Sequence, residues 1–213
     1  MHAPHRSPLA AAAWMLAAVA SFSLMDAGIK LLSAHYPPLQ VTLLRGAASL
    51  PFVLVWVLAS AGVRSIVPVR WGLHLLRGVL GIMMMGSFVY ALGSLPLSTA
   101  YSIFFVAPLL ITALSVPILG EHVGPRRWTA IAVGLLGVLV VLRPTGEGVL
   151  TLAGLAVLVA AFGYAVSAIL VRVLARTDST QATTFWPPAM MALGAGALAL
   201  PDWVPLRGEH LWI

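Results

Sequence analysis

The chain has 213 residues, of which 61% are hydrophobic and only 8% charged, and its mean hydropathy is +1.01. Soluble domains carry about a quarter charged residues, so this composition excludes a water-soluble globule. The 12 Lys and Arg outnumber the six Asp and Glu but form no basic stripe, and there is no cysteine. A nucleic-acid-binding protein, a disulfide framework and a thiolate metal site are therefore excluded, and we expect an all-α, polytopic membrane protein.

Seven apolar stretches follow one another along the chain, and a helix needs about 20 residues to cross a bilayer. They cover residues 9–32, 39–60, 72–92, 98–119, 128–142, 151–174 and 183–201. Proline, glycine or charged residues separate them, as at Tyr36-Pro37-Pro38 and Leu95-Pro96. The sequence therefore predicts about seven transmembrane helices joined by short connections.

The positions of Lys and Arg predict the orientation of these helices, because cytoplasmic loops are enriched in both residues. A cytoplasmic N-terminus would place eight basic residues on the inner side and four on the outer side. The inner set is Arg6, Arg64, Arg70, Arg77, Arg126, Arg127, Arg172 and Arg176, and the outer set is Lys30, Arg45, Arg143 and Arg207. We therefore expect the N-terminus to be cytoplasmic.

Two parts of the sequence resemble each other at an offset of 140 or 141 residues. Ala20-Ser21-Phe22 matches Ala160-Ala161-Phe162, and Trp71 matches Trp212. We interpret this as a repeat of five helices, whose second copy would cross the membrane in the opposite direction, as in many secondary transporters. Residues 1–142 would form the first repeat. Residues 143–213 would begin the second, inverted repeat, truncated so that about seven of an expected ten helices are visible.

Asp26 is the clearest candidate for function, because carboxylates inside transmembrane helices are rare and costly. It lies six residues before the outer end of the first stretch, and Arg45 lies six residues into the second stretch from the same side. Lys30, one turn from Asp26, is a competing partner. We expect Asp26 and Arg45 to pair, either to steady the two helices or as a substrate or proton site. Snorkelling of Asp26 to the interface is a third alternative.

The fourth stretch carries a stripe of residues on one helical face, namely Tyr101, Phe105, Pro108, Thr112 and Ser115. The hydroxyl groups serve either interhelical hydrogen bonds or the wall of a cavity. Pro108 favours the cavity, because proline leaves one helix carbonyl without its usual donor. If later helices of the second repeat are missing, we expect the stripe to face lipid or another chain.

Three further residues are candidates for the substrate pathway. Tyr90 is either an interfacial anchor or a cavity residue, and Tyr164 and Ser167 in the sixth stretch either line the pathway or only pack. The sequence has no G-x-S-x-G, H-E-x-x-H or P-loop motif, and its six histidines are wrongly spaced for zinc. We therefore expect no enzyme activity, no catalytic residues, no metal and no cofactor.

An ordered set of short motifs resembles the EamA domain of the drug/metabolite transporter superfamily. The motifs are Ala91-Leu92, Leu95-Pro96-Leu97-Ser98-Thr99-Ala100, Pro108-Leu109, Gly120-Glu121, Trp128 and Gly134-Leu135-Leu136-Gly137-Val138, with Lys30 and Arg45 also fitting. The resemblance covers residues 9–142 as one domain and 151–213 as the start of a second. It implies ten helices in two inverted repeats, a cytoplasmic N-terminus, and a cavity lined by helices one, three and four of each half. Lys30 and Glu121 would then have structural roles at helix ends.

The leading hypothesis is a secondary transporter that moves small metabolites across the cytoplasmic membrane by alternating access. Its pathway would include Asp26, Arg45, Tyr90, Tyr101, Pro108, Thr112, Tyr164 and Ser167. The expected partners are a small-molecule substrate and membrane lipid, not nucleic acid, and a homo-oligomer is left open. The alternative is a transport-inactive, truncated membrane protein that packs with another chain.

Overall fold

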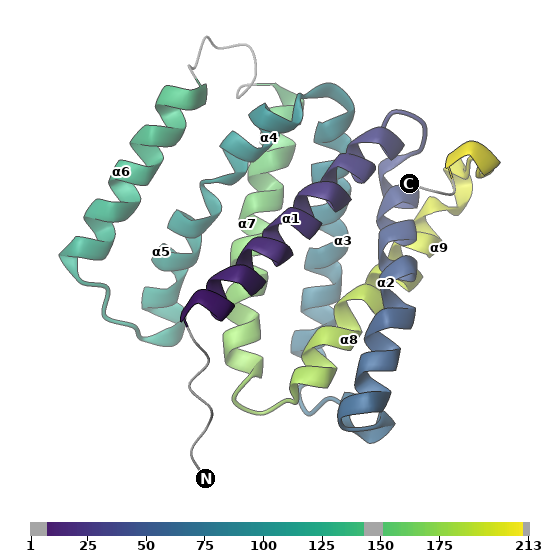
Figure 1. The fold of residues 1–213 in the computed structure, drawn as a ribbon, viewed down its shortest axis with the longest axis horizontal. Coiled ribbons are helices and arrows are strands. Elements are labelled where there is room, and N and C mark those ends of the chain that lie inside the picture. Colours follow the sequence, from purple (N-terminus) through teal and green to yellow (C-terminus); the bar gives the residue numbers. More distant parts are fainter. Residues whose placement is uncertain (1–7, 143–150, 211–213) are drawn as a thin grey trace.

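The structure is a computed structural model that describes residues 8–142 and 151–210, and within these ranges it contains helices and no strands (Figure 1). The long helices are α1 (Pro8–Leu32), α2 (Pro38–Ser60), α3 (Trp71–Ser94), α4 (Leu97–Phe104), α5 (Ala107–Leu119), α6 (Pro125–Leu142), α7 (Leu152–Leu174) and α8 (Thr180–Met190). The short elements are η1 (Val63–Ile66), the π-helical turn η2 (Met191–Ala195), α9 (Gly196–Ala199), η3 (Leu200–Asp202) and η4 (Gly208–His210).

Five segments of the described chain are long and apolar enough to cross a membrane. They are Ala12–Leu32, Pro38–Ser60, Trp71–Ser94, Leu97–Leu119 and Leu152–Leu174. Many large apolar side chains also point outward, among them Trp14, Leu24, Phe52 and Val140. In water such a surface would be unfavourable, whereas against lipid it is the expected one. The prediction of an all-α, polytopic membrane protein is confirmed.

Local sequence signals explain where the helices begin and end. α2 and α6 begin at Pro38 and Pro125, and proline is well suited to the first turn, where no amide donor is needed. α5 ends at Gly120, whose φ of 67° is the left-handed conformation that glycine adopts readily. Ser179 accepts a hydrogen bond from the amide of Ala182 (3.0 Å) and caps the start of α8.

Two of the predicted stretches are not single regular helices. The fourth is divided into α4 and α5, because Pro108 has no amide hydrogen to donate to the carbonyl of Phe104. The seventh contains Pro187 and Pro188 inside α8 and then widens into the π-helical turn η2 before α9. The first interruption lies just before Pro108 and the second follows Pro188, and proline is the residue that removes one helix hydrogen bond.

The helices form a bundle in which α3 contacts α2, α7 and α8 (Figure 1). α1 and α3 begin at the same end of the bundle, which also holds the α7–α8 turn; we call it the N-terminal face. α2 packs along α8 and η2, and this packing is close. A Cβ atom on Gly46 would lie 2.8 Å from the amide nitrogen of Ala192 and 2.9 Å from the carbonyl oxygen of Pro188. Only glycine permits the two backbones to approach in this way.

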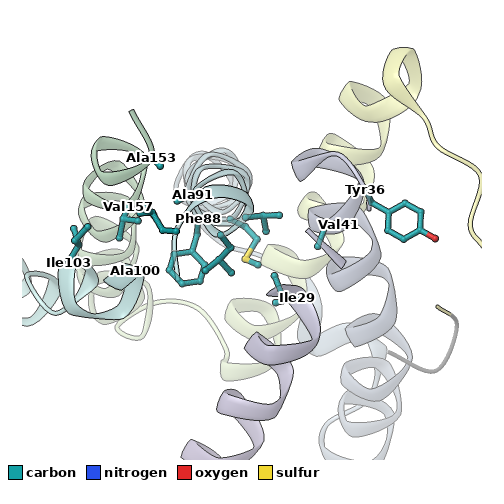
Figure 2. Packing of buried hydrophobic residues seen from close by; sticks show 14 of the residues in the cluster. Ile29, Tyr36, Val41, Phe88, Ala91, Ala100, Ile103, Ala153 and Val157 are labelled. Atoms are coloured by element: carbon teal, nitrogen blue, oxygen red, sulfur yellow. The ribbon is translucent and has the colours of Figure 1, made fainter. Parts of the chain in front are cut away.

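A cluster of buried apolar residues surrounds the upper half of α3 in Figure 1, and Figure 2 shows it from close by. Helices α1, α2, α4 and α7 each contribute to it, through Ile29, Val41, Ile103 and Val157 respectively. In contrast, residues 12–24 of α1 are exposed throughout. The described chain therefore buries α3 well and attaches α1 mainly through its C-terminal third.

Candidate functional site

Asp26 forms its hydrogen bond with a tyrosine of a distant helix. The Tyr101 hydroxyl of α4 donates to Asp26 Oδ2 of α1, and both residues are half-buried. The contact joins two candidates that the sequence analysis placed in the pathway without pairing them. A carboxylate held by a phenol inside an apolar bundle is a polar site that a membrane protein maintains at a cost.

The direct ion pair expected between Asp26 and Arg45 is not formed, although both residues lie in the described part of the chain. Arg45 directs Nη1 toward the sulfur of Met85 at 2.6 Å, and it interacts with Asp26 and Tyr101 only through longer-range electrostatics. The described part of α1 makes its main helix contact with α3 and not with α2, so equal depth in the two helices did not bring the side chains together. The Tyr101 hydroxyl donates its hydrogen bond to the Asp26 carboxylate in place of the expected Arg45.

Lys30, the expected competitor for Asp26, binds the end of α3. Its ammonium group donates to the carbonyl oxygen of Leu92 and, at 2.9 Å, to that of Leu95. Carbonyls in the last turn of a helix have no amide partner, and a cation there also interacts favourably with the helix dipole. Lys30 therefore attaches the end of α1 to the end of α3.

The polar stripe of the fourth stretch does not face lipid as a unit, so that expectation is corrected. Thr112 and Ser115 are 4% and 0% exposed and lie on α5, which packs against α7. Thr112 donates to the carbonyl of Pro108 (3.0 Å) and Ser115 to that of Thr112 (2.9 Å). Phe105, in contrast, is 62% exposed. The break before Pro108 divides the stripe, with Tyr101 directed toward α1.

A series of aromatic rings connects this site to α7. The ring centroids of Tyr101 and Phe88 lie 6.2 Å apart, those of Phe88 and Phe104 lie 5.6 Å apart, and those of Phe104 and Tyr164 lie 5.4 Å apart. These separations are within the range in which aromatic rings attract one another. Two predicted pathway residues, Tyr101 and Tyr164, are thus linked through Phe88 and Phe104, which the sequence analysis did not select.

A cavity of about 350 Å³ lies at the opposite end of the bundle from the N-terminal face. Helices α2, α3, α7 and α9 and the turn η3 surround it. Its lining residues are Pro37, Pro38, Leu39, Gly86, Ser87, Tyr90, Ala156, Leu198, Ala199 and Asp202. The volume is at the lower end of the range for small-molecule pockets. Tyr90 is the only predicted pathway residue in this lining.

Ser167 belongs to a polar group nearer the N-terminal face, around two residues that the sequence analysis missed. Arg77 of α3 is 9% exposed and donates to Ser167 Oγ (3.4 Å) and to the carbonyl of Thr183 (2.9 Å). One turn earlier, His74 is fully buried, and its Nε2 lies 3.0 Å from Asp178 Oδ1. Their position inside the third apolar stretch was the available signal, because ionisable residues in transmembrane helices are usually functional.

Asp178, in the turn between α7 and α8, is held in its ionised form. Burial alone would raise the pKa of this carboxyl. Hydrogen bonds from Thr177, His74 and the backbone amides of Val69 and Arg70 instead lower the pKa from 3.8 to about 2. Because Asp178 is an anion at neutral pH, Nε2 of His74 is the donor of their hydrogen bond.

Glu121 follows α5 and forms an ion pair with Arg172 of α7. Arg172 Nη1 lies 3.3 Å from Glu121 Oε2, and Nη2 contacts Oε1. The two side chains are 44% and 30% exposed, so the pair contributes only about 0–1 kcal/mol. Glu121 therefore connects the α5–α6 segment to α7 at the N-terminal face, away from the aromatic series.

Taken together, the fold and these buried polar groups define a multi-pass helical membrane protein. A family model described as the EamA-like transporter family matches residues 9–143. Because this match covers more than half of the 213 residues, the chain belongs to the EamA-like transporter family.

Curated relatives of this chain carry the names of small-molecule transporters. A riboflavin transporter of Vibrio cholerae is 29% identical over 210 residues, which are 97% of this chain and 70% of the relative. An S-adenosylmethionine uptake transporter of Rickettsia prowazekii is 32% identical over 62% of this chain and 44% of its own length. A pseudopaline exporter of Pseudomonas aeruginosa is 27% identical over 89% of this chain and 67% of its own length. The comparison with solved structures found no significant match.

Proposed function

We propose that the chain acts in secondary transport of a small metabolite across the cytoplasmic membrane by alternating access. The observation that supports this proposal most directly is the Tyr101–Asp26 hydrogen bond inside an apolar bundle. Arg45 is close enough to interact with this pair electrostatically. Membership in a transporter family supports the same function. In this proposal Asp26, Tyr101 and Arg45 bind the polar groups of the substrate, and Tyr164 lines the route beyond them.

The proposed substrate is a planar heteroaromatic metabolite with polar substituents, of which riboflavin is the first to test. The relative that aligns over 97% of this chain is a riboflavin transporter. Phe88, Phe104 and Tyr164 supply ring faces and edges beside the polar site. Rings of this kind bind planar ligands by stacking, while a carboxylate and a guanidinium orient their polar edge.

The proposed orientation has the N-terminus in the cytoplasm. In the described chain, the N-terminal face carries Arg64 and Arg70 near η1, Arg126 and Arg127 at the start of α6, and Arg176 after α7. The opposite end of the bundle carries Lys30 and Arg207. This asymmetry supports the proposal, because basic residues accumulate on the cytoplasmic side.

Uptake by a bacterial strain that neither makes nor imports riboflavin tests the function. We expect cells expressing the protein to accumulate labelled riboflavin saturably, and D26N and Y101F each to reduce this uptake about tenfold or more. F105L is the matched control, because Phe105 faces outward. Normal uptake in D26N and Y101F would reject the proposed site.

Two further outcomes separate the parts of the proposal. Flux of S-adenosylmethionine but not riboflavin would overturn the proposed substrate and leave the transport function intact. Absence of flux for every probe, in cells and in inside-out vesicles, would favour the alternative of a membrane protein that packs with another chain without transporting.

A further inference from the structure

The N-terminal face of the bundle is closed by hydrogen bonds that converge on one carboxylate. Asp178 Oδ1 accepts from the backbone amide of Val69 (2.8 Å), from that of Arg70 (3.4 Å) and from Nε2 of His74 (3.0 Å). These donors belong to the connection between α2 and α3 and to the first turn of α3. One side chain of the α7–α8 turn therefore holds a segment more than 100 residues earlier in the sequence.

Neighbouring contacts join the same two segments. The hydroxyl of Ser179 donates to the carbonyl of Ser65, and Nε1 of Trp186 donates to the carbonyl of Ile66 at 2.8 Å. Nε2 of Gln181 lies 3.2 Å from Oγ of Ser60. Hydrogen bonds therefore join the two segments at several points, beside one ring contact between Trp71 and Trp186 at 4.5 Å, whereas the other half of α3 is surrounded by an apolar cluster.

A polar closure of this kind can open more easily than an apolar one. Water replaces a broken hydrogen bond, so each contact contributes little net free energy, whereas separating packed apolar surfaces has no such compensation. The side chains of His74 and Asp178 are completely buried, and Nδ1 of His74 has no hydrogen-bond partner among the residues that the structure describes. That nitrogen would gain a partner from water when the face opens, so the closed arrangement is not the most favourable one for this side chain.

We propose that Asp178 is the latch of a gate at the N-terminal face. It holds the α2–α3 connection and the start of α3 against the α7–α8 turn while this face is closed, and it releases them each time the face opens. The proposal rests on the alternating-access function proposed above. His74 is a positioning residue of the latch and does not contact the substrate.

Cysteine labelling tests the gate without any substrate. The natural sequence has no cysteine, so the reagent labels only the cysteine that is introduced. Ala182 is fully buried beside the latch, and A182C adds only a sulfur atom. In inside-out vesicles, we expect D178N to raise the maleimide labelling rate of A182C about tenfold, which corresponds to 1.4 kcal/mol. E209Q, which changes an exposed carboxylate at the other end, should leave the rate unchanged.

A second reporter distinguishes a gate from a general loss of stability. Ala199 lines the cavity at the opposite end and is 2% exposed. In alternating access, opening one end closes the other, so D178N should leave labelling of A199C unchanged or lower it. Faster labelling of both reporters, or no change at A182C, would overturn the latch. T180C is exposed and calibrates the reagent in every variant.

Reversible cross-linking connects the latch to transport. We expect a short bis-methanethiosulfonate bridge between V69C and D178C to stop flux, and dithiothreitol to return flux to the level of the same double variant before bridging. Full flux through the bridged protein would overturn the latch. If the labelling experiments behave as expected but the protein shows no riboflavin flux, the proposed substrate is wrong and the latch stands.

Discussion

Tyr101 donates a hydrogen bond to Asp26 and thereby joins α4 to α1 across 75 residues of sequence. Most of α1 is exposed, and its polar attachments lie toward its C-terminal end, at Asp26 and Lys30. The same contact therefore has two consequences. Together with the Lys30 contacts, it fixes where α1 lies against the bundle, and it presents a carboxylate, a phenol and the nearby guanidinium of Arg45 as one polar site.

Asp26 and Tyr101 should be energetically coupled. Y101F leaves the half-buried carboxylate without its donor, and D26N exchanges an anionic acceptor for a neutral one. We expect each single change to destabilise the protein, and a double-mutant cycle to give a coupling energy of about 1–3 kcal/mol. Thermal unfolding in detergent measures the cycle, with F105L and D26N as an uncoupled control pair. Additive effects of Y101F and D26N would show that the hydrogen bond contributes nothing.

Lys30 should contribute to stability through the end of α3. K30M keeps the length of the side chain and removes both contacts to the carbonyls of Leu92 and Leu95. We expect a loss of about 1–3 kcal/mol, because hydrogen bonds from charged groups are the stronger ones. K30R, which retains the charge and the donors, should recover part of it. Equal unfolding temperatures for K30M and the natural protein would contradict this role.

Gly46, the single glycine of α2, should not tolerate replacement by alanine. In G46A the new methyl group would meet the backbone of Ala192 and Pro188 at less than 3 Å, so α2 and η2 must move apart. We expect a destabilisation of about 1–3 kcal/mol. G134A in α6 is the control, because a Cβ there meets nothing within 4 Å. Because alanine has a higher helix propensity than glycine, G134A should be neutral or slightly stabilising.

Acid should weaken the N-terminal face through Asp178. The pKa of this carboxyl is lowered from 3.8 to about 2, so its contribution to stability is complete above about pH 4 and is lost as the pH falls toward 2. Thermal unfolding between pH 5 and pH 2 should therefore show a decline in the natural protein that D178N lacks. Parallel pH profiles for the two proteins would exclude Asp178 as the source of the loss of stability in acid.

The helices were largely predictable from the sequence, because apolar length and proline or glycine punctuation act locally. The predicted stretches 72–92 and 151–174 compare with Trp71–Ser94 and Leu152–Leu174 in the structure. Pro108 was also recognised as an interruption, although not as the point where the fourth stretch divides into two helices. The π-helical turn after Pro188 had no signal in the hydrophobic pattern.

The candidate site was only partly predictable, because its partners come from helices distant in sequence. Asp26 was identified because a carboxylate inside a membrane has a high free-energy cost. Its hydrogen-bond partner, however, is Tyr101 and not Arg45. Arg77 was counted only as a charge on the inner side, and His74 only among histidines that are wrongly spaced for zinc. Their burial depends on how α7 and α8 pack against α3, which no local pattern reveals.

The π-helical turn Met191–Ala195 makes the end of the chain sensitive to length as well as to composition. A π turn accommodates one residue more than an α turn, and it alters the direction of every side chain that follows. Removing one residue between positions 190 and 196 would restore a regular helix and rotate the following segment by about 100°. Leu198 and Ala199 would then turn away from the cavity, and Val204 would lose both of its hydrogen bonds with Gln40. A single-codon deletion here would thus alter the molecule more than many substitutions in the same segment.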